Sequence, residues 1–242
     1  VGDGSNLTGV ASTENIRTNT NATFLQNVNV GVAITAGKLG IGFTDAQIKI
    51  GNTALDSLTT GTLNTAVGDA ALTATTTGQQ NTAVGAYALD ANTTGDFNTG
   101  VGLNALTGNT TGDSNTALGV SALKTASTAD NNTAVGYFSL RANTTGTQNV
   151  AVGANALLSN TTAYDNVAIG FEAGKSITDG LRNTFIGAEC GEDNTASNNT
   201  GVGQRALRAT TTGANNVAIG REALLSNTTG ASNVAVGANA LD

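Results

Sequence analysis

The stretch NTAVGAYALDANTTGDF, residues 81–97, is followed directly by NTGVGLNALTGNTTGDS, residues 98–114. The same order of residues returns every 17 positions from Asn64 to the end of the chain. The copies begin at Asn64, Asn81, Asn98, Asn115, Asn132, Asn149, Asn166, Asn183, Asn199, Asn216 and Asn233, and the copy 183–198 is one residue short. A short fixed period is typical of a solenoid, in which each unit buries its apolar face only by stacking on its neighbours.

The unit reads N-[TV]-[AG]-[VIL]-G-x-x-[AS]-L-x-x-[NT]-T-T-G-x-x, and we count its positions from the Asn. Seventeen residues are too few for a helix pair, and the Gly, Thr and Val content disfavours helix. Positions 2 to 4 alternate between β-branched and small residues, as a strand requires. The fold class predicted is therefore all-β, a parallel β-solenoid of 17-residue coils.

The repeated apolar positions predict the core. We expect the β-branched face of the strand to point into the coil and the Leu at position 9 to form a second buried column. The predicted core residues are Val67, Leu72, Val84, Leu89, Val101, Leu106, Val135, Leu140, Val152, Leu157, Ile169, Ile219 and Leu224. The Gly at position 5 predicts a corner with positive φ or a close backbone approach, at Gly68, Gly85, Gly102, Gly119, Gly136 and Gly153. The NTTG run predicts the return turn, in which Asn and Thr bond their own backbone or form ladders between coils.

The domains predicted are a β-rich adapter or linker at 1–63 and the solenoid at 64–242. The first part lacks the period but has β-like runs at 28–34, 39–43 and 47–50, and a possible short helix at 15–26. Within the solenoid, Gly174 and Gly191 replace the Leu of position 9, while Phe171 and Phe185 stand nearby. We expect a local repacking or bulge there.

Composition argues against several classes of function. The 242 residues include 30 Asn, 41 Thr and 32 Gly but no His, a single Cys and only 11% charged residues. The groups needed for acid/base catalysis and transition-metal binding are thus mostly missing, so we expect neither an enzyme nor a cofactor. A net charge of -7 with scattered Lys and Arg disfavours nucleic acid, and no apolar run is long enough to insert into a membrane.

Each coil has few large apolar residues, so its core is thin. Burying a few Val and Leu side chains barely offsets the cost of ordering 17 residues, roughly 1–2 kcal/mol each for the backbone. We therefore expect an obligate oligomer, most simply a homotrimer with the small Ala and Gly positions at the contacts.

The strings NVAVG and NVAIG, at residues 149–153 and 166–170, resemble the head repeats of trimeric autotransporter adhesins. The unit NTAVGAYALDANTTG is also similar to repeats in bacteriophage tail-fibre proteins, and the start GDGSNLTGVASTENIRTNTNATFLQNVNV is similar to segments of structural proteins of marine cyanobacterial phages. The resemblance implies a homotrimeric fibre located in a virion tail and therefore extracellular. Its implied partners are itself, other virion proteins and a host surface glycan or protein.

Individual residues offer few candidate sites. Cys190 stands at position 8, where other copies have Ala or Ser, so we expect a small buried residue. We expect the Glu189, Glu192 and Asp193 cluster to be a solvated acidic patch rather than a metal site, since calcium-loop spacing is absent. The exposed aromatic residues could stack on sugars or fill grooves between chains: Tyr87, Phe97, Tyr137, Phe138 and Tyr164.

Two further sequence patterns coincide with the turn. The Asn-Thr-Thr triplets match glycosylation acceptors but recur because the turn recurs; they begin at Asn92, Asn109, Asn143, Asn160 and Asn227. Thr runs at 75–77 and 210–212 could order water as in ice-binding solenoids, although their place in a turn argues against it. The function expected is a structural fibre shaft that supports host attachment. The alternatives are a bacterial trimeric surface adhesin and an ice- or polysaccharide-binding solenoid.

Overall fold

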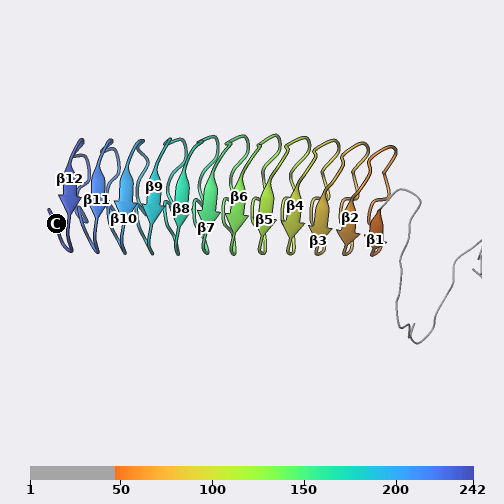
Figure 1. Cartoon of the computed structure of the whole chain (residues 1–242), viewed down its shortest axis with the longest axis horizontal. Coiled ribbons are helices and arrows are strands. Elements are labelled where there is room, and N and C mark those ends of the chain that lie inside the picture. Colours follow the sequence, from red (N-terminus) through yellow and green to blue (C-terminus); the bar gives the residue numbers. More distant parts are fainter. Residues whose placement is uncertain (1–46) are drawn as a thin grey trace, which may run out of the picture. The chain divides into compact units, whose positions relative to one another are not determined.

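The computed structural model describes residues 47–242, and within them every regular element is a short β-strand. The twelve strands are β1 Ile48–Ile50, β2 Thr65–Val67, β3 Thr82–Val84, β4 Thr99–Val101, β5 Thr116–Leu118, β6 Thr133–Val135, β7 Val150–Val152, β8 Val167–Ile169, β9 Thr184–Ile186, β10 Thr200–Val202, β11 Val217–Ile219 and β12 Val234–Val236. Each strand opens one coil, and the coils follow one another in a row (Figure 1). The predicted parallel β-solenoid is confirmed.

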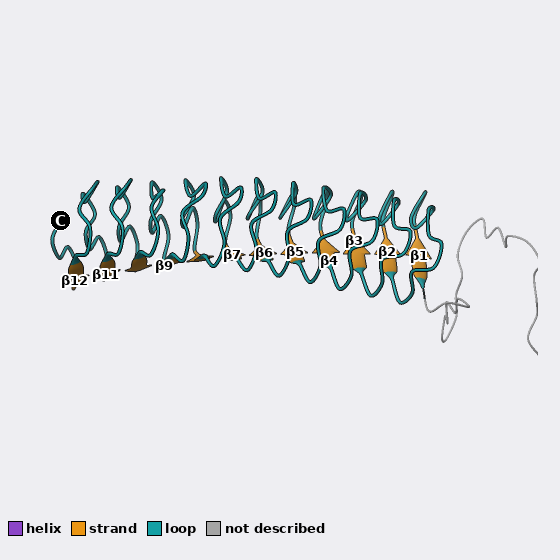
Figure 2. Ribbon diagram, turned by 90° about the horizontal axis from the view of Figure 1, so that it is seen from above, coloured by secondary structure: helices purple, strands orange, loops and turns teal. Residues whose placement is uncertain are grey.

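All twelve strands form one parallel sheet in chain order, so every coil lies between its two neighbours in the sequence. Ala151 pairs with Ala134 on one side and Ala168 on the other, so like positions stack on like positions. The strands lie along one side of the row, and turns make up the rest of each coil (Figure 2). Each outward position of the unit therefore forms a column that runs along the solenoid.

The coil interior differs from the prediction at the strand. The middle residue of the strand is the buried one, for example Ala66, Ala83 and Ala151, each with no exposed surface. The prediction that the β-branched face points inward is wrong, since these residues are half-buried or exposed: Val67, Val84, Val101, Val135, Val152, Ile169 and Ile219.

The width of the coil explains this inversion. A Cβ atom placed on Gly100, the middle residue of β4, would lie 3.3 Å from Leu89 Cγ and 3.3 Å from the Ala105 carbonyl oxygen. The interior thus has room for a methyl group but not for a Val side chain, because Leu of position 9 already fills it. The predicted Leu column is buried as expected: Leu72, Leu89, Leu106, Leu140, Leu157 and Leu224.

The Gly at position 5 is explained by both reasons that the sequence suggested. Gly68 has φ of 141°, and the Gly85, Gly102, Gly119, Gly136 and Gly153 residues have φ between 132° and 140°. A Cβ on Gly68 would also lie 2.5 Å from the Gly85 carbonyl carbon in the next coil. Any side chain there would meet a disallowed backbone conformation and a steric clash together.

Position 1 carries a ladder of buried Asn side chains. Asn149 Nδ2 donates to the Ala163 carbonyl oxygen at 2.8 Å, across its own coil. Asn149 Oδ1 accepts the backbone N–H of Asn166 at 3.1 Å, in the next coil. Each Asn therefore closes one coil and joins it to the next, which satisfies buried polar groups on both sides.

The turn residues form ladders as predicted. Asn109 Nδ2 donates to Asn92 Oδ1 at 2.7 Å, and Thr93 Oγ1 donates to the Thr110 carbonyl oxygen at 2.9 Å. The Asn of the Asn-Thr-Thr triplets is buried in the coil at Asn92, Asn109, Asn143 and Asn160. A glycan on any of these buried side chains is therefore incompatible with the folded coil.

The solenoid includes a coil before residue 64, the predicted boundary. β1 pairs with β2, and Gln47 takes the role of the missing Asn: its Nε2 donates to the Gly61 carbonyl oxygen at 2.6 Å, and its Oε1 accepts the N–H of Asn64 at 3.0 Å. The sequence boundary at 64 was wrong because Gln47 and Lys49 replace the Asn and Ala of the unit. The β-like run 47–50 contains β1, whereas the runs at 28–34 and 39–43 and the helix at 15–26 lie outside the described residues.

The expected repacking lies around Phe185, in the middle of β9. Its ring is fully buried, and a Cβ atom on Gly191 would lie 2.6 Å from Phe185 Cζ. A Cβ on Gly174 would lie 3.3 Å from Phe185 Cδ2. Phe185 thus fills the space at Gly191 and shares the space at Gly174 with Leu157 and the buried Ile177, whereas Phe171 is about half exposed.

The missing residue of the β9 coil is absorbed in its turn. Asn183 Nδ2 donates to the Ala196 carbonyl oxygen, 13 residues ahead, whereas the corresponding bond of the other coils spans 14 residues. The N–H of Asn199 still donates to Asn183 Oδ1 at 2.9 Å. The ladder of position 1 therefore continues without a break.

Candidate interaction face

The outward face of the sheet is the most extensive uniform surface in the part of the chain described. It consists of positions 2 and 4 of the unit, the first and third residue of every strand, and we call it the sheet face. Every residue on it is Thr, Val, Ile or Leu, and none is charged. A face of this composition along twelve successive coils is unusual for a surface in water, where charged side chains normally intervene.

The side chains of the sheet face remain accessible although they stack on one another. Val84, Ile169 and Ile219 expose 37%, 38% and 42% of their surface, and Leu118 exposes 48%. Position 4 contributes the apolar column Ile50, Val67, Val84, Val101, Leu118, Val135, Val152, Ile169, Ile186, Val202, Ile219 and Val236. This column forms a continuous apolar strip along the solenoid, available to a partner.

Position 2 places a column of Thr beside this strip. Seven strands begin with Thr: Thr65, Thr82, Thr99, Thr116, Thr133, Thr184 and Thr200. The Thr runs 75–77 and 210–212 lie in the return turn as expected, and Thr75 and Thr210 are buried there. The sequence pattern does not predict this accessible Thr column, because it places the β-branched face of the strand in the interior.

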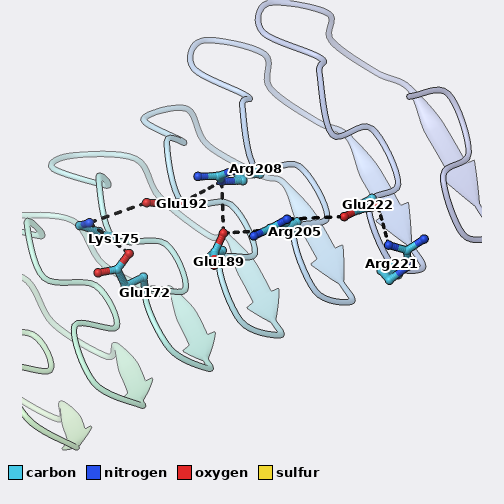
Figure 3. Close-up of polar contacts among 8 residues, drawn as sticks. All are labelled: Glu172, Lys175, Glu189, Glu192, Arg205, Arg208, Arg221 and Glu222. Carbon is cyan, nitrogen blue, oxygen red and sulfur yellow. Dashed lines mark hydrogen bonds and ion pairs between the residues drawn. The ribbon is translucent and has the colours of Figure 1, made fainter.

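A network of ion pairs lies on another side of the solenoid, at positions 7 and 10 of the β8 to β11 coils (Figure 3). Arg208 Nε lies 2.8 Å from Glu192 Oε2 and 3.4 Å from Glu189 Oε2, and Arg205 Nε lies 2.9 Å from the same Glu189 oxygen. Lys175 Nζ lies 3.1 Å from Glu172 Oε2 and 3.7 Å from Glu192 Oε1.

The charges of this network affect the pKa of its carboxylates. Partial desolvation opposes ionisation of Glu192, but the hydrogen bond and charge of Arg208, with the charge of Lys175, outweigh it and lower the Glu192 pKa. Glu189 and Glu192 are thus held by cations from neighbouring coils rather than forming an isolated acidic patch. No group of three Cys, Asp or Glu side chains within residues 47–242 is arranged to hold a metal ion.

The remaining sequence candidates are scattered. Cys190 is fully buried, and desolvation raises the pKa of its thiol to about 12. Tyr137 and Phe138 stack with ring centroids 3.9 Å apart, and Arg141 lies over the Phe138 ring at 4.5 Å. Tyr87, Phe97 and Tyr164 stand in other coils, so the structure does not bring the five aromatic residues together.

A surface hollow of about 430 Å³ lies on the solenoid, lined by Thr125, Arg141, Ala142, Leu158 and Ser159. It was not predicted from the sequence, because its residues come from positions 10 and 11 of three successive coils. Within residues 47–242, no helix is long and apolar enough to cross a membrane.

Comparison with known proteins leaves the geometry as the basis for any assignment. No family model, curated protein or solved structure matches the chain.

Proposed function

We propose that this chain is a shaft segment of a homotrimeric fibre, in which the sheet faces of three copies pack around a common axis. The observation that carries the proposal is the sheet face itself, accessible, uncharged and uninterrupted from β1 to β12. Most of its residues are β-branched, and β-branched side chains lose little conformational entropy when a partner covers them.

The interface proposed differs from the one expected from the sequence. The small Ala residues of the strand are buried inside each coil, so the contact between copies is made by Val, Ile, Leu and Thr of positions 2 and 4. Burying this strip adds apolar area to every coil, at about 25 cal/mol per Å². That gain supplements the core of a single coil, whose interior is mostly Ala methyl groups and one Leu.

The function proposed is mechanical. The eleven steps between the twelve strands, at the inter-strand spacing of about 4.8 Å, give a section roughly 53 Å long, held by a continuous parallel ladder. Three such chains side by side resist bending and carry whatever lies at the ends of the fibre in three copies, which raises avidity for a host surface. The resemblance to tail-fibre repeats supports a place in a virion tail, outside the cell, among other tail proteins; a bacterial trimeric surface adhesin is the alternative with the same architecture.

Sedimentation equilibrium of the full chain tests the assembly. We expect a trimer that persists at nanomolar concentration. Val152→Lys with Ile169→Lys places two charges on the sheet face and should yield monomers, because a buried unpaired charge is costly. The matched control, Thr145→Lys with Thr162→Lys, adds the same charges in the exposed return turn and should remain trimeric.

The outcomes separate the parts of the proposal. A folded wild-type monomer would refute the fibre shaft. A dimer would refute the count of three, which comes from the resemblance, while the loss of assembly in the first variant alone would still support the sheet face as the contact.

A second candidate, binding of ice or ordered water, is favoured by one observation. The Thr column of position 2 lies on a parallel sheet and repeats at the inter-strand spacing, for example at Thr99, Thr116 and Thr133. This function needs an uncovered sheet face and therefore a monomer. Thermal hysteresis that disappears in Thr116→Tyr, measured on a monomeric sample, would support it, and its absence at millimolar protein would exclude it.

A further inference from the structure

Two cations lie side by side in the β5 and β6 coils without an acidic partner. Lys124 and Arg141 occupy position 10 of successive coils, and the Thr125 backbone N–H and Oγ1 both donate to the Arg141 carbonyl oxygen, at 3.2 and 2.8 Å. Within residues 47–242 every other Lys and Arg lies within 4 Å of a carboxylate: Lys49, Lys175, Arg182, Arg205, Arg208 and Arg221.

Position 10 of the later coils shows how charges are arranged where they only stabilise the fold. In the β8 to β10 coils position 10 carries Lys175, Glu192 and Arg208, so the sign alternates from coil to coil. Like charges at neighbouring surface positions repel one another, whereas opposite charges attract. The Lys124–Arg141 pair departs from the alternation, because two positive charges stand on successive coils with no carboxylate within 4 Å of either.

The surface hollow lies at Arg141, and Lys124 directly precedes Thr125, another residue of its wall. Arg141 forms part of its wall, next to the hydroxyl groups of Thr125 and Ser159, and Ala142 and Leu158 provide an apolar surface. A hollow that combines a cation, two hydroxyl groups and an aliphatic surface matches a ligand with the same mixture, such as a sugar ring that has hydroxyl groups on its edge and C–H groups on its face.

The aromatic pair orients the guanidinium. Arg141 lies 4.5 Å from the centroid of the Phe138 ring, which itself stacks on Tyr137 at an interplanar angle of 17°. Stacking holds the plane of the guanidinium while its N–H edge stays free to bind an anion. About half of the Tyr137 surface is exposed, so an aromatic ring is also available beside the cations.

We propose that Lys124, Arg141 and the adjoining hollow form a binding site for an acidic saccharide, a sugar that carries a carboxylate or sulfate group. The two cations bind the anionic group, Ser159 Oγ bonds to a sugar hydroxyl, Thr125 Oγ1, whose proton is donated to the Arg141 carbonyl, accepts a bond from another, and Leu158 contacts the ring. Two cations are too few to follow a nucleic acid backbone, where affinity requires several phosphate contacts. The site is complete within one chain and lies away from the sheet face, so it does not rest on the proposed fibre.

Isothermal titration calorimetry of the full chain tests the site. The probes are a tetragalacturonate and a sulfated heparin tetrasaccharide, with maltotetraose as the neutral saccharide and inorganic sulfate as the bare anion. We expect at least one acidic tetrasaccharide to bind, with affinity that falls as salt rises, and Lys124→Gln with Arg141→Gln to weaken it at least tenfold. Lys175→Gln, which removes a carboxylate-paired cation from the same column, should leave the affinity within twofold of wild type.

Two further variants test the rest of the hollow. Leu158→Asp should weaken binding at least tenfold through its charge, and Ser159→Ala should weaken it severalfold with the fold unchanged by circular dichroism. The proposal is overturned if neither acidic tetrasaccharide binds at 1 mM, or if maltotetraose or sulfate alone binds as tightly as they do. An equal loss in Lys175→Gln would also overturn it. Sedimentation of the same samples shows separately whether the assembly is intact.

Discussion

Individual residues in every coil have a strained backbone conformation. Leu89, Leu106 and Leu157, at position 9, have φ of 53°, 53° and 49°, a left-handed conformation that costs an L-residue roughly 1–2 kcal/mol. Burial of the Leu side chain offsets that cost. Gly174 and Gly191 keep the same φ, 58° and 60°, without strain, so replacing Leu by Gly there loses packing but relieves the backbone.

Phe185 restores the packing that these two glycines lose. We expect Phe185→Ala to destabilise the neighbouring coils by about 3–5 kcal/mol, because it leaves a cavity. Adding Gly174→Leu and Gly191→Leu to it should recover much of that loss, whereas Gly191→Leu alone should be destabilising because its Cβ would lie 2.6 Å from the ring. Native-state hydrogen exchange of β8 to β10 measures the local free energies of opening.

Phe171→Ala is the matched control for this series, since that ring is about half exposed. Equal effects of Phe171→Ala and Phe185→Ala, or no recovery in the triple variant, would show that the three positions are not coupled.

Cys190 offers a second test at this scale. Its raised pKa, about 12, and its burial predict a thiol that stays protonated and unreactive in the native protein. An Ellman assay at pH 8 should detect no thiol before denaturation and one per chain afterwards. As pH rises through the range where the unfolded thiol ionises, stability should fall, because only the unfolded chain forms the thiolate readily. Rapid modification of the native protein would contradict the burial.

At the scale of the coil, the sequence predicts most of the architecture but not which way the strand faces. The period, the strand positions, the Gly corner and the Leu column follow from residues that recur at fixed spacing. Alternation at Val150, Ala151 and Val152 identifies two faces, yet the choice between them depends on the width of the coil. That width is set by Leu157 opposite the strand and by the backbone geometry of the turns, which no local pattern specifies.

The site residues show the same division. The burial of Cys190 could be predicted, because its neighbours at position 8 are small. The pairing of Glu189 with Arg205 and the hollow beside Arg141 could not, because they depend on which columns lie next to each other around the coil. The repeat pattern does not identify Gln47, because its first position is Asn in every other coil, although a Gln amide makes the same two hydrogen bonds.

Interrupting the Asn ladder should weaken two adjacent coils. Asn149→Ala removes the acceptor of the Asn166 N–H and the donor to the Ala163 carbonyl, so two buried polar groups lose a partner. We expect a loss of about 2–6 kcal/mol, at 1–3 kcal/mol for each unsatisfied group. Hydrogen exchange of β7 and β8 should report it locally. Thr162→Ala, an exposed change in the same coil, should have almost no effect, and similar protection in both variants would contradict the role of the ladder.

For the whole solenoid, the parallel ladder in chain order predicts that complete coils are interchangeable. Deleting residues 98–114 joins Phe97 to Asn115, the same junction as at every other coil, so the protein should fold with one coil fewer. Deleting residues 98–105 removes less than half as many residues but shifts every later inward position, so it should fail to fold. Circular dichroism and the number of protected amides distinguish the two, and equal tolerance of both deletions would contradict the stacked-coil architecture.

The columns that run along the solenoid have a consequence for how such a protein evolves. Inward positions are fixed by the narrow coil, while each outward position touches mainly its own column and the columns beside it. Outward positions can thus be substituted without altering the core, so that the surface can gain a charge pair, an aromatic pair or an apolar strip. Duplication of a coil adds a second set of the same outward residues. These extra residues can change and give new surface chemistry while the fold persists.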